Sequence, residues 1–255
     1  MKTSIIEVTP TKDGYIAKEM AGGLGKRIRL NGGFVGKTLE TYLSKMFIAP
    51  PMILAQVAGI CKDFGHSVQV HRTNNVLDLD SDTDLAIILG TMVDYQNERS
   101  FSRNLKQALS NTKVVFLGSF PTAKPDVFLD YADHVIVGDP EYGLNKLLNG
   151  EVSSPGLIDS PSLDDLNAIS PPDWRPFIDI GYLARRPFSH ERGVCIQKSR
   201  GCSMSCNYCP YAGIYGKANH YDTEYVVDLI RHYREHHNIR YFMFRDPNFG
   251  ENRRQ

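Results

Sequence analysis

The clearest indication of fold class is at residues 84–90, Asp84-Leu85-Ala86-Ile87-Ile88-Leu89-Gly90. It is a continuous apolar run between an aspartate and a glycine, and polar and apolar side chains do not alternate within it. A strand of this kind is typical of a parallel sheet, because helices cover both faces of such a sheet. The run therefore predicts a buried strand in a protein of the α/β class.

Strands and helices are expected to alternate on both sides of this run. The other expected strands are residues 28–30, 67–70, 113–117 and 134–137. Apolar residues at helical spacing, ending at Gly65, predict a helix over 51–64. Further helices are expected over 101–109, 125–130 and 141–148. The alternation predicts a doubly wound, parallel, five-stranded Rossmann-like sheet in residues 26–150.

The rest of the chain is expected to fall into three parts. Residues 1–25 are polar and dotted with glycine, and they predict an irregular N-terminal segment; residues 31–50 predict a long loop. Serine and proline are frequent after residue 150, so residues 151–190 are expected to be a linker. Residues 191–255 then read as strand 193–197, a cysteine loop, helix 223–237 and strand 240–244. Two strands cannot cover their own faces, so this second domain looks truncated.

Composition excludes several classes of protein. The 255 residues contain 29 Lys and Arg and 29 Asp and Glu, and this zero net charge does not suggest a nucleic-acid partner. No apolar run is long enough for a signal peptide or a membrane span. Three of the five cysteines lie within eight residues, which does not resemble a disulfide framework. The expected location is the reducing cytoplasm.

The three clustered cysteines are Cys202, Cys206 and Cys209, and their spacing is Cys-x3-Cys-x2-Cys. Three thiolates on a loop that leaves a strand can converge on one four-iron cluster and leave one iron open to an external ligand. The last two alone could form a redox pair or half of a zinc site. A ferredoxin-type cluster would need a fourth cysteine, but Cys195 falls within a strand and Cys61 within a distant helix.

This loop, led in by Arg200-Gly201, resembles the signature of radical S-adenosylmethionine enzymes. The resemblance implies a partial (β/α)6 barrel, of which residues 191–255 would be the first part. It also implies a [4Fe-4S] cluster on the three cysteines, with S-adenosylmethionine on the open iron. Tyr208 would lie near the adenine or cover the cluster from water. In Phe244-Arg245-Asp246-Pro247-Asn248-Phe249, Asp246 would approach the methionyl amine or cap the next helix.

The first domain is expected to bind a ligand at the carboxyl ends of its strands. The candidate residues there are Thr91, Gly118, Ser119 and Gly138. The residues alone leave the ligand open. The order of Ala49-Pro50-Pro51, the segments 64–68 and 117–119, and the segment 132–139 is similar to the cobalamin-binding domain of cobalamin-dependent radical enzymes. An Asp-x-His-x-x-Gly element is absent, so cobalamin would bind without a histidine on cobalt, and His66 and His134 are expected to be structural.

The function implied is a radical enzyme that generates a 5′-deoxyadenosyl radical, with cobalamin as a second cofactor, for methyl transfer or another C–H functionalisation. A flavodoxin or ferredoxin would supply the electron, and a small molecule would be the substrate. The sequence does not identify further catalytic residues. One alternative is a radical protein whose first domain does not bind cobalamin. Another is a non-catalytic iron–sulfur electron-transfer or binding protein.

Overall fold

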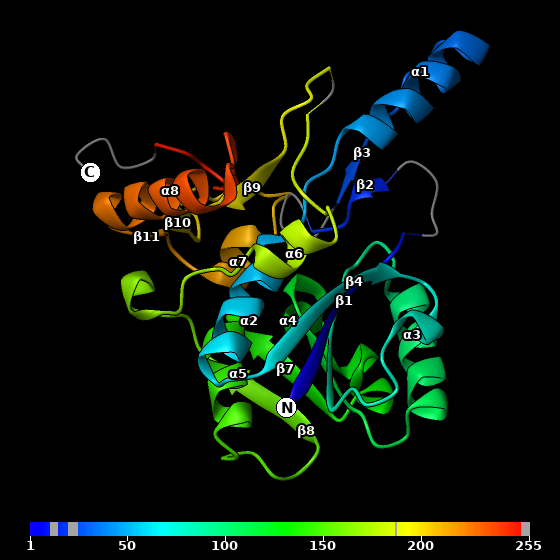
Figure 1. The fold of residues 1–255 in the computed structure, drawn as a ribbon, viewed down its shortest axis with the longest axis vertical. Coiled ribbons are helices and arrows are strands. Elements are labelled where there is room, and N and C mark those ends of the chain that lie inside the picture. Colours follow the sequence, from blue (N-terminus) through cyan, green and yellow to red (C-terminus); the bar gives the residue numbers. More distant parts are fainter. Residues whose placement is uncertain (11–14, 20–24, 187, 251–255) are drawn as a thin grey trace. The chain divides into compact units, whose positions relative to one another are not determined.

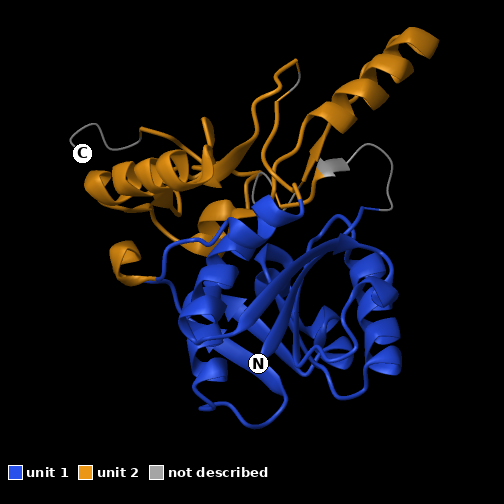
Figure 2. Ribbon diagram, viewed as in Figure 1, with its two compact units in different colours: residues 1–11, 53–163, 170–180 blue, residues 12–52, 164–169, 181–255 orange. Residues whose placement is uncertain are grey.

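The computed structural model describes the chain except residues 11–14, 20–24, 187 and 251–255. The chain forms two compact units (Figure 2). The first contains residues 1–11, 53–163 and 170–180, and the second contains residues 12–52, 164–169 and 181–255. Each unit is thus built from segments that are far apart in the sequence, and the division differs from the expected boundaries at residues 25, 150 and 190.

A parallel sheet forms the centre of the first unit (Figure 1). Its strand order is β4-β1-β5-β6-β7-β8, and every neighbouring pair is parallel. The strands are β1 (Lys2–Val8), β4 (Ser67–Thr73), β5 (Leu85–Leu89), β6 (Lys113–Leu117), β7 (His134–Gly138) and β8 (Gly156–Ser160). The predicted α/β class and Rossmann-like sheet are confirmed, and all five residues of β5 are buried as its apolar run predicted.

The sheet has six strands rather than the predicted five, because two segments with weak sequence signals join it. Strand β1 lies between β4 and β5, so the prediction of an irregular segment over residues 1–25 was wrong. Its polar residues are accommodated by specific partners: Thr3 Oγ1 lies 2.8 Å from His66 Nδ1, and Ser4 Oγ lies 3.2 Å from Thr83 Oγ1. Strand β8 pairs with β7 from within the expected linker.

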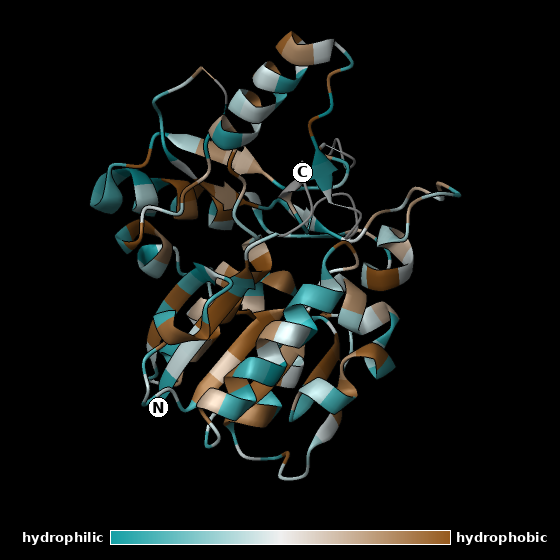
Figure 3. Cartoon of the chain, turned by 90° about the vertical axis from the view of Figure 1, so that its right-hand side faces the viewer, coloured by the Kyte–Doolittle hydropathy of each residue, from teal (hydrophilic) through white to brown (hydrophobic). Residues whose placement is uncertain are grey.

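Helices cover both faces of this sheet. They are α2 (Met52–Asp63), α3 (Tyr95–Ala108), α4 (Ser119–Ala123), α5 (Pro140–Leu148) and α6 (Arg175–Asp179). Phe101 and Leu105 of α3 share a core with Val135 of β7, whereas Gly143 of α5 lies against Ile136, which points to the other face. Apolar residues concentrate on the strands between these layers (Figure 3). The helix expected over 125–130 is instead two 3₁₀ turns, η2 (Pro125–Val127) and η3 (Leu129–Tyr131).

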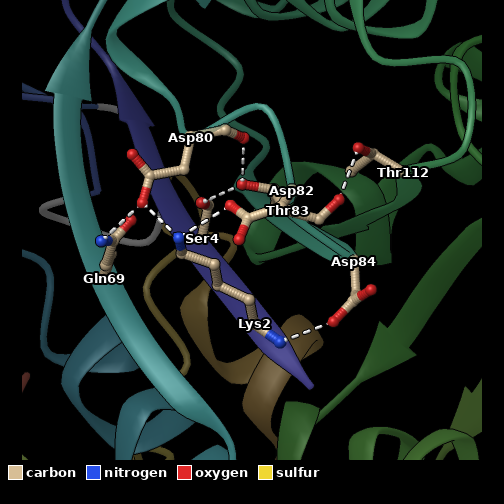
Figure 4. A network of polar contacts seen from close by, with 8 residues as sticks. All are labelled: Lys2, Ser4, Gln69, Asp80, Asp82, Thr83, Asp84 and Thr112. Carbon is tan, nitrogen blue, oxygen red and sulfur yellow. Dashed lines mark hydrogen bonds and ion pairs between the residues drawn. The ribbon is translucent and has the colours of Figure 1, made fainter.

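A polar network fixes the amino-terminal ends of neighbouring strands (Figure 4). The backbone N–H of Lys2, which begins β1, donates to Asp84 Oδ2 at 2.7 Å. Its Nζ pairs with Asp80 at 2.5 Å and Asp82 at 2.7 Å, and hydrogen bonding between Lys2 and Asp80 raises the pKa of the ammonium and lowers that of the carboxyl. Thr112, before β6, donates to the carbonyl of Thr83. These contacts therefore help to fix the alignment of neighbouring strands in the sheet.

The second unit contains one parallel strand–helix–strand unit. Strand β9 (Gly193–Ile196) pairs with β12 (Tyr241–Phe244), and helix α8 (Thr223–His237) lies between them in sequence. The smaller elements are η1 (Val76–Asp78) in the first unit, and in the second β2 (Tyr15–Ala17), β3 (Lys26–Arg27), η4 (Leu166–Ala168), β10 (Ser199–Arg200), α7 (Tyr211–Tyr215) and β11 (Asn219–His220). The strands and helix of the predicted second domain are confirmed; the remainder of a barrel stays a prediction.

Two predictions for residues 26–50 were wrong. Residues 28–30 are not a strand, and β3, which ends at Arg27, pairs with β2 in the second unit. Residues 31–50 are not one long loop, because helix α1 spans Gly33–Met46. The three glycines at 32, 33 and 36 obscured this helix, since glycine is a poor helix former. Among the described helices, none is both long enough and apolar enough to span a lipid bilayer.

Candidate cofactor site

The cysteine loop of the second unit is closed at its base. Strands β10 and β11 pair antiparallel, with Ser199 opposite His220 and Arg200 opposite Asn219. Gly201 follows with φ of +79°, and a Cβ there would lie 2.1 Å from the carbonyl oxygen of Lys217. Only glycine therefore fits where the two sides of the loop approach each other. The N–H of Cys202 then donates to the carbonyl of Gly216 at 3.1 Å.

The far part of the loop folds into a turn and a short helix. The N–H of Cys209 donates to the carbonyl of Cys206 at 3.1 Å, which places these two cysteines on one turn. Helix α7 starts directly after Pro210, and the rings of Tyr211 and Tyr215 lie 4.7 Å apart. Local hydrogen bonds thus shape the segment that carries the candidate ligands.

The three loop cysteines are free thiols. Cys206 is exposed, while Cys202 and Cys209 are partly exposed. No three His, Cys, Asp or Glu side chains in the described part of the chain are close enough to hold a metal ion, so the thiols are not gathered at one point. The donor chemistry nevertheless fits an iron–sulfur cluster, because three accessible thiols lie on one loop.

The other two cysteines differ from the loop cysteines in burial. Cys61 in α2 and Cys195 in β9 are both fully buried. Burial raises the pKa of the Cys61 thiol to about 12, and it also raises the pKa of Cys195. Both therefore remain protonated at neutral pH, whereas metal ligands must be thiolates. Their burial agrees with the expectation that neither Cys61 nor Cys195 is a ligand of the cluster.

The two other residues predicted around the cluster lie in very different surroundings. The side chain of Tyr208 is 82% exposed, and its expected position near an adenine or over the cluster stays a prediction. Asp246 follows β12, and both of its carboxylate oxygens accept from the N–H of Lys198, at 3.0 and 3.1 Å. Its Oδ1 also accepts from Ser199 Oγ at 2.7 Å. The described residues after it, up to Gly250, form bends and a turn, so the expected helix cap is not seen there.

The candidate ligand residues of the first unit meet at one edge of the sheet, as predicted. Thr91 follows β5, Gly118 and Ser119 follow β6, and Gly138 ends β7. Thr91 is fully buried and held by Glu98 of α3. Its N–H donates to Oε2 at 2.7 Å, and its hydroxyl donates to Oε1 at 2.5 Å. The Thr91 side chain is therefore used within the fold.

The glycines at this edge are required by the packing of the protein itself. A Cβ on Gly118, at φ of +122°, would lie 2.9 Å from the carbonyl oxygen of Gly90. A Cβ on Gly138, at φ of +110°, would lie 1.8 Å from the carbonyl oxygen of Ser160 in β8. Neighbouring strands, rather than a flat ligand, thus account for both glycines. Ser119 is buried, and its hydroxyl has no hydrogen-bond partner among the described residues. Cobalamin binding at this edge stays a prediction.

The two histidines expected to be structural both lie in the first unit. His66 contacts Thr3 of β1 through Nδ1, and His134 begins β7 and is buried. Burial lowers the pKa of both imidazoles, which favours the neutral ring at physiological pH. His134 is thus packed within the sheet, and His66 lies directly before β4, beside the start of β1.

Comparison with protein-family models finds none that matches the chain, and comparison with curated proteins finds no match. Residues that position the candidate site were also missed by sequence reasoning. Glu98 is seven residues from Thr91, and Ser199 is 47 residues from Asp246. Neither pair has a sequence motif, because the first forms only when helix α3 packs beside the end of β5 and the second only when β9 pairs with β12.

Proposed function

We propose that this chain is a radical S-adenosylmethionine protein in which Cys202, Cys206 and Cys209 hold a [4Fe-4S] cluster. The observation that carries the proposal is the placement of three accessible thiols on one closed loop between two parallel strands. When bound, the cluster would deliver one electron that cleaves S-adenosylmethionine into methionine and a 5′-deoxyadenosyl radical.

The chain's own residues would bind and orient the cofactors. The three thiols would leave one iron open, since a four-iron cluster has four metal positions. The antiparallel pair β10 and β11 holds the base of the loop, and the turn from Cys206 to Cys209 keeps two ligands together. Tyr208 is exposed on the same loop and would cover the adenine or shield the cluster from water.

Cobalamin is proposed as the second cofactor on the sequence resemblance, with binding at the carboxyl edge of the first unit's sheet. Among the candidate residues at this edge, the buried Ser119 hydroxyl has no hydrogen-bond partner in the described part of the chain and is one group that a ligand would satisfy. The reaction that follows would be methyl transfer or another C–H functionalisation of a small molecule, with a flavodoxin or ferredoxin as electron donor.

Anaerobic reconstitution with iron and sulfide tests the cluster. The reduced protein should show the electron paramagnetic resonance (EPR) signal of a [4Fe-4S]⁺ centre, and S-adenosylmethionine should change that signal by binding the open iron. The variant C202A/C206A/C209A should take up no cluster, whereas the matched variant C61A removes a buried thiol of the first unit and should retain it. Wild-type protein without a cluster would contradict the proposal.

The same experiment separates the rival functions. An EPR signal that does not respond to S-adenosylmethionine would favour a non-catalytic iron–sulfur protein, because the cofactor would not be reaching an open iron.

Purification after growth with cobalamin tests the second cofactor. Corrin absorbance that remains with the protein through gel filtration supports cobalamin binding. Protein that binds a cluster but no corrin would favour the rival whose first domain does not bind cobalamin.

A further inference from the structure

Two charged residues, Arg245 and Asp246, directly follow strand β12, and their side chains have different partners. The backbone N–H of Arg245 still donates to the carbonyl of Ile196 in β9, at 2.8 Å. The guanidinium of Arg245 donates to the carbonyls of Pro50 at 3.3 Å and Glu19 at 3.2 Å. It also lies 3.8 Å from Cys195 Sγ in β9. Arg245 therefore fixes the end of β12 within the second unit.

Asp246 connects this anchored strand end to the base of the cysteine loop. Its carboxylate receives the N–H of Lys198 on both oxygens and the hydroxyl of Ser199 on Oδ1. Ser199 is the first residue of β10, and Cys202 follows three residues later. Hydrogen bonds to an ionised carboxylate are stronger than those between neutral groups. The carboxylate therefore sets where the loop leaves the sheet.

Lys198 is held a second time on the opposite side of the loop. Its Nζ donates to the carbonyl of Tyr221, and the N–H of Tyr221 donates to the carbonyl of Lys198 at 2.9 Å. The outgoing and returning sides of the loop thus meet at Lys198. Displacing Asp246 would leave a partly buried N–H without its acceptor, and an unsatisfied donor of this kind is costly.

We propose that Asp246 is a positioning residue for the cysteine loop and acts on the cluster through Lys198 and Ser199, rather than by contact with S-adenosylmethionine. This inference rests on the proposed cluster on Cys202, Cys206 and Cys209. Replacing a group that orients a metal ligand through a hydrogen bond typically lowers metal affinity by about 10- to 100-fold. Asp246 acts one step further from the ligands, because it holds Lys198 and Ser199 at the base of the loop rather than a cysteine.

The test compares reconstituted Asp246→Ala with wild-type protein, both as the 255-residue chain. Iron retention is measured against a chelator, and the EPR spectrum of the reduced cluster is recorded first without and then with S-adenosylmethionine. Asp246→Ala should retain iron about tenfold less well, and its spectrum should be altered before the cofactor is added. Asp246→Asn keeps one oxygen acceptor and should give an intermediate result. Ser199→Ala should shift the spectrum in the same direction by less.

Asp173→Ala is the matched control in the first unit. Asp173 also accepts from a backbone N–H, that of Arg175 at 3.1 Å, and from a neighbouring side chain. Its loss destabilises the fold without touching the loop, so it should leave the EPR spectrum of the reduced cluster unchanged. A wild-type-like spectrum for Asp246→Ala, with only the response to S-adenosylmethionine lost, would overturn the inference in favour of direct contact. Absence of a cluster in the wild type would instead overturn the proposed function.

Discussion

At the scale of single residues, the five cysteines divide by burial into two classes with different chemistry. Cys61 and Cys195 are inside the units, while the three loop cysteines reach the surface. The spacing of the loop cysteines could be read from the sequence, because ligands to one cluster come from a short segment. The partners of Asp246 could not, because Lys198 lies 48 residues away and is brought close only by the pairing of β9 with β12.

Thiol labelling should distinguish the two buried cysteines from the three cysteines of the loop. In cluster-free native protein kept reduced and then freed of reductant, three thiols should react rapidly with a disulfide reagent such as DTNB. All five should react after unfolding in guanidinium. The variant C195A should leave the native count unchanged and lower the unfolded count by one. Rapid labelling of more than three thiols in the native protein would contradict the burial of Cys61 and Cys195.

The buried thiol of Cys61 should make stability sensitive to alkaline pH. Its pKa is about 12 in the folded protein and 9.0 as the ordinary value, so the folded state keeps the proton that the unfolded state loses. Its contribution to stability is thus complete below about pH 9 and is lost as the pH rises toward 12. Between about pH 8 and 10, wild type should lose about 1.4 kcal/mol more unfolding free energy than C61A. Parallel pH profiles from urea titrations would contradict this.

At the scale of elements, apolar pattern predicted four of the six strands of the large sheet and failed where polar residues or glycines carry the element. Strand β5 is wholly apolar and was predicted, whereas β1 has three consecutive polar or charged residues at its start. Its position between β4 and β5 buries Thr3 and Ser4, and contacts with His66 and Thr83 make that burial possible. Tertiary contacts of this kind leave no periodic signal in the sequence.

The join between β7 and β8 should be intolerant of any side chain at Gly138. Gly138→Ala combines an unfavourable φ of +110° with a Cβ only 1.8 Å from the Ser160 oxygen, so β8 would have to shift. We expect a loss of about 3 kcal/mol or more in unfolding free energy. Gly150 is the matched control, because its φ is +75° and no atom lies within 4 Å of a Cβ there. Gly150→Ala should cost about 1 kcal/mol. Equal losses in urea titrations would contradict the contact with β8.

At the scale of the whole molecule, the two units have very different sheets. The first has six parallel strands with helices on both faces, while the described sheets of the second have two strands each. Small sheets depend more strongly on their surroundings for stability. The sequence predicted two domains, but each unit contains segments that the predicted boundaries placed elsewhere. Residues 1–11 belong to the first unit, and residues 12–52 belong to the second.

Unfolding should therefore not follow a single transition. The only tryptophan, Trp174, is fully buried in the first unit, so its fluorescence reports that unit alone. Circular dichroism reports helices and strands of both units. In urea, the midpoint of the fluorescence change should lie at a higher urea concentration than the first change in circular dichroism. Coincident transitions by both probes would indicate one cooperative unit instead.

The pairing of β10 with β11 has a consequence for the chain entropy of the cysteine loop. The segment from Gly201 to Ala218 is already a closed ring before any metal arrives, since Ser199 and Arg200 are paired with His220 and Asn219. Closing a flexible ring is an entropic cost that rises slowly with its length. Here the pairing of β10 with β11 closes the ring when the unit folds, so metal uptake needs to order only the tip of the ring. Iron should thus be able to leave and return without unfolding the unit around it.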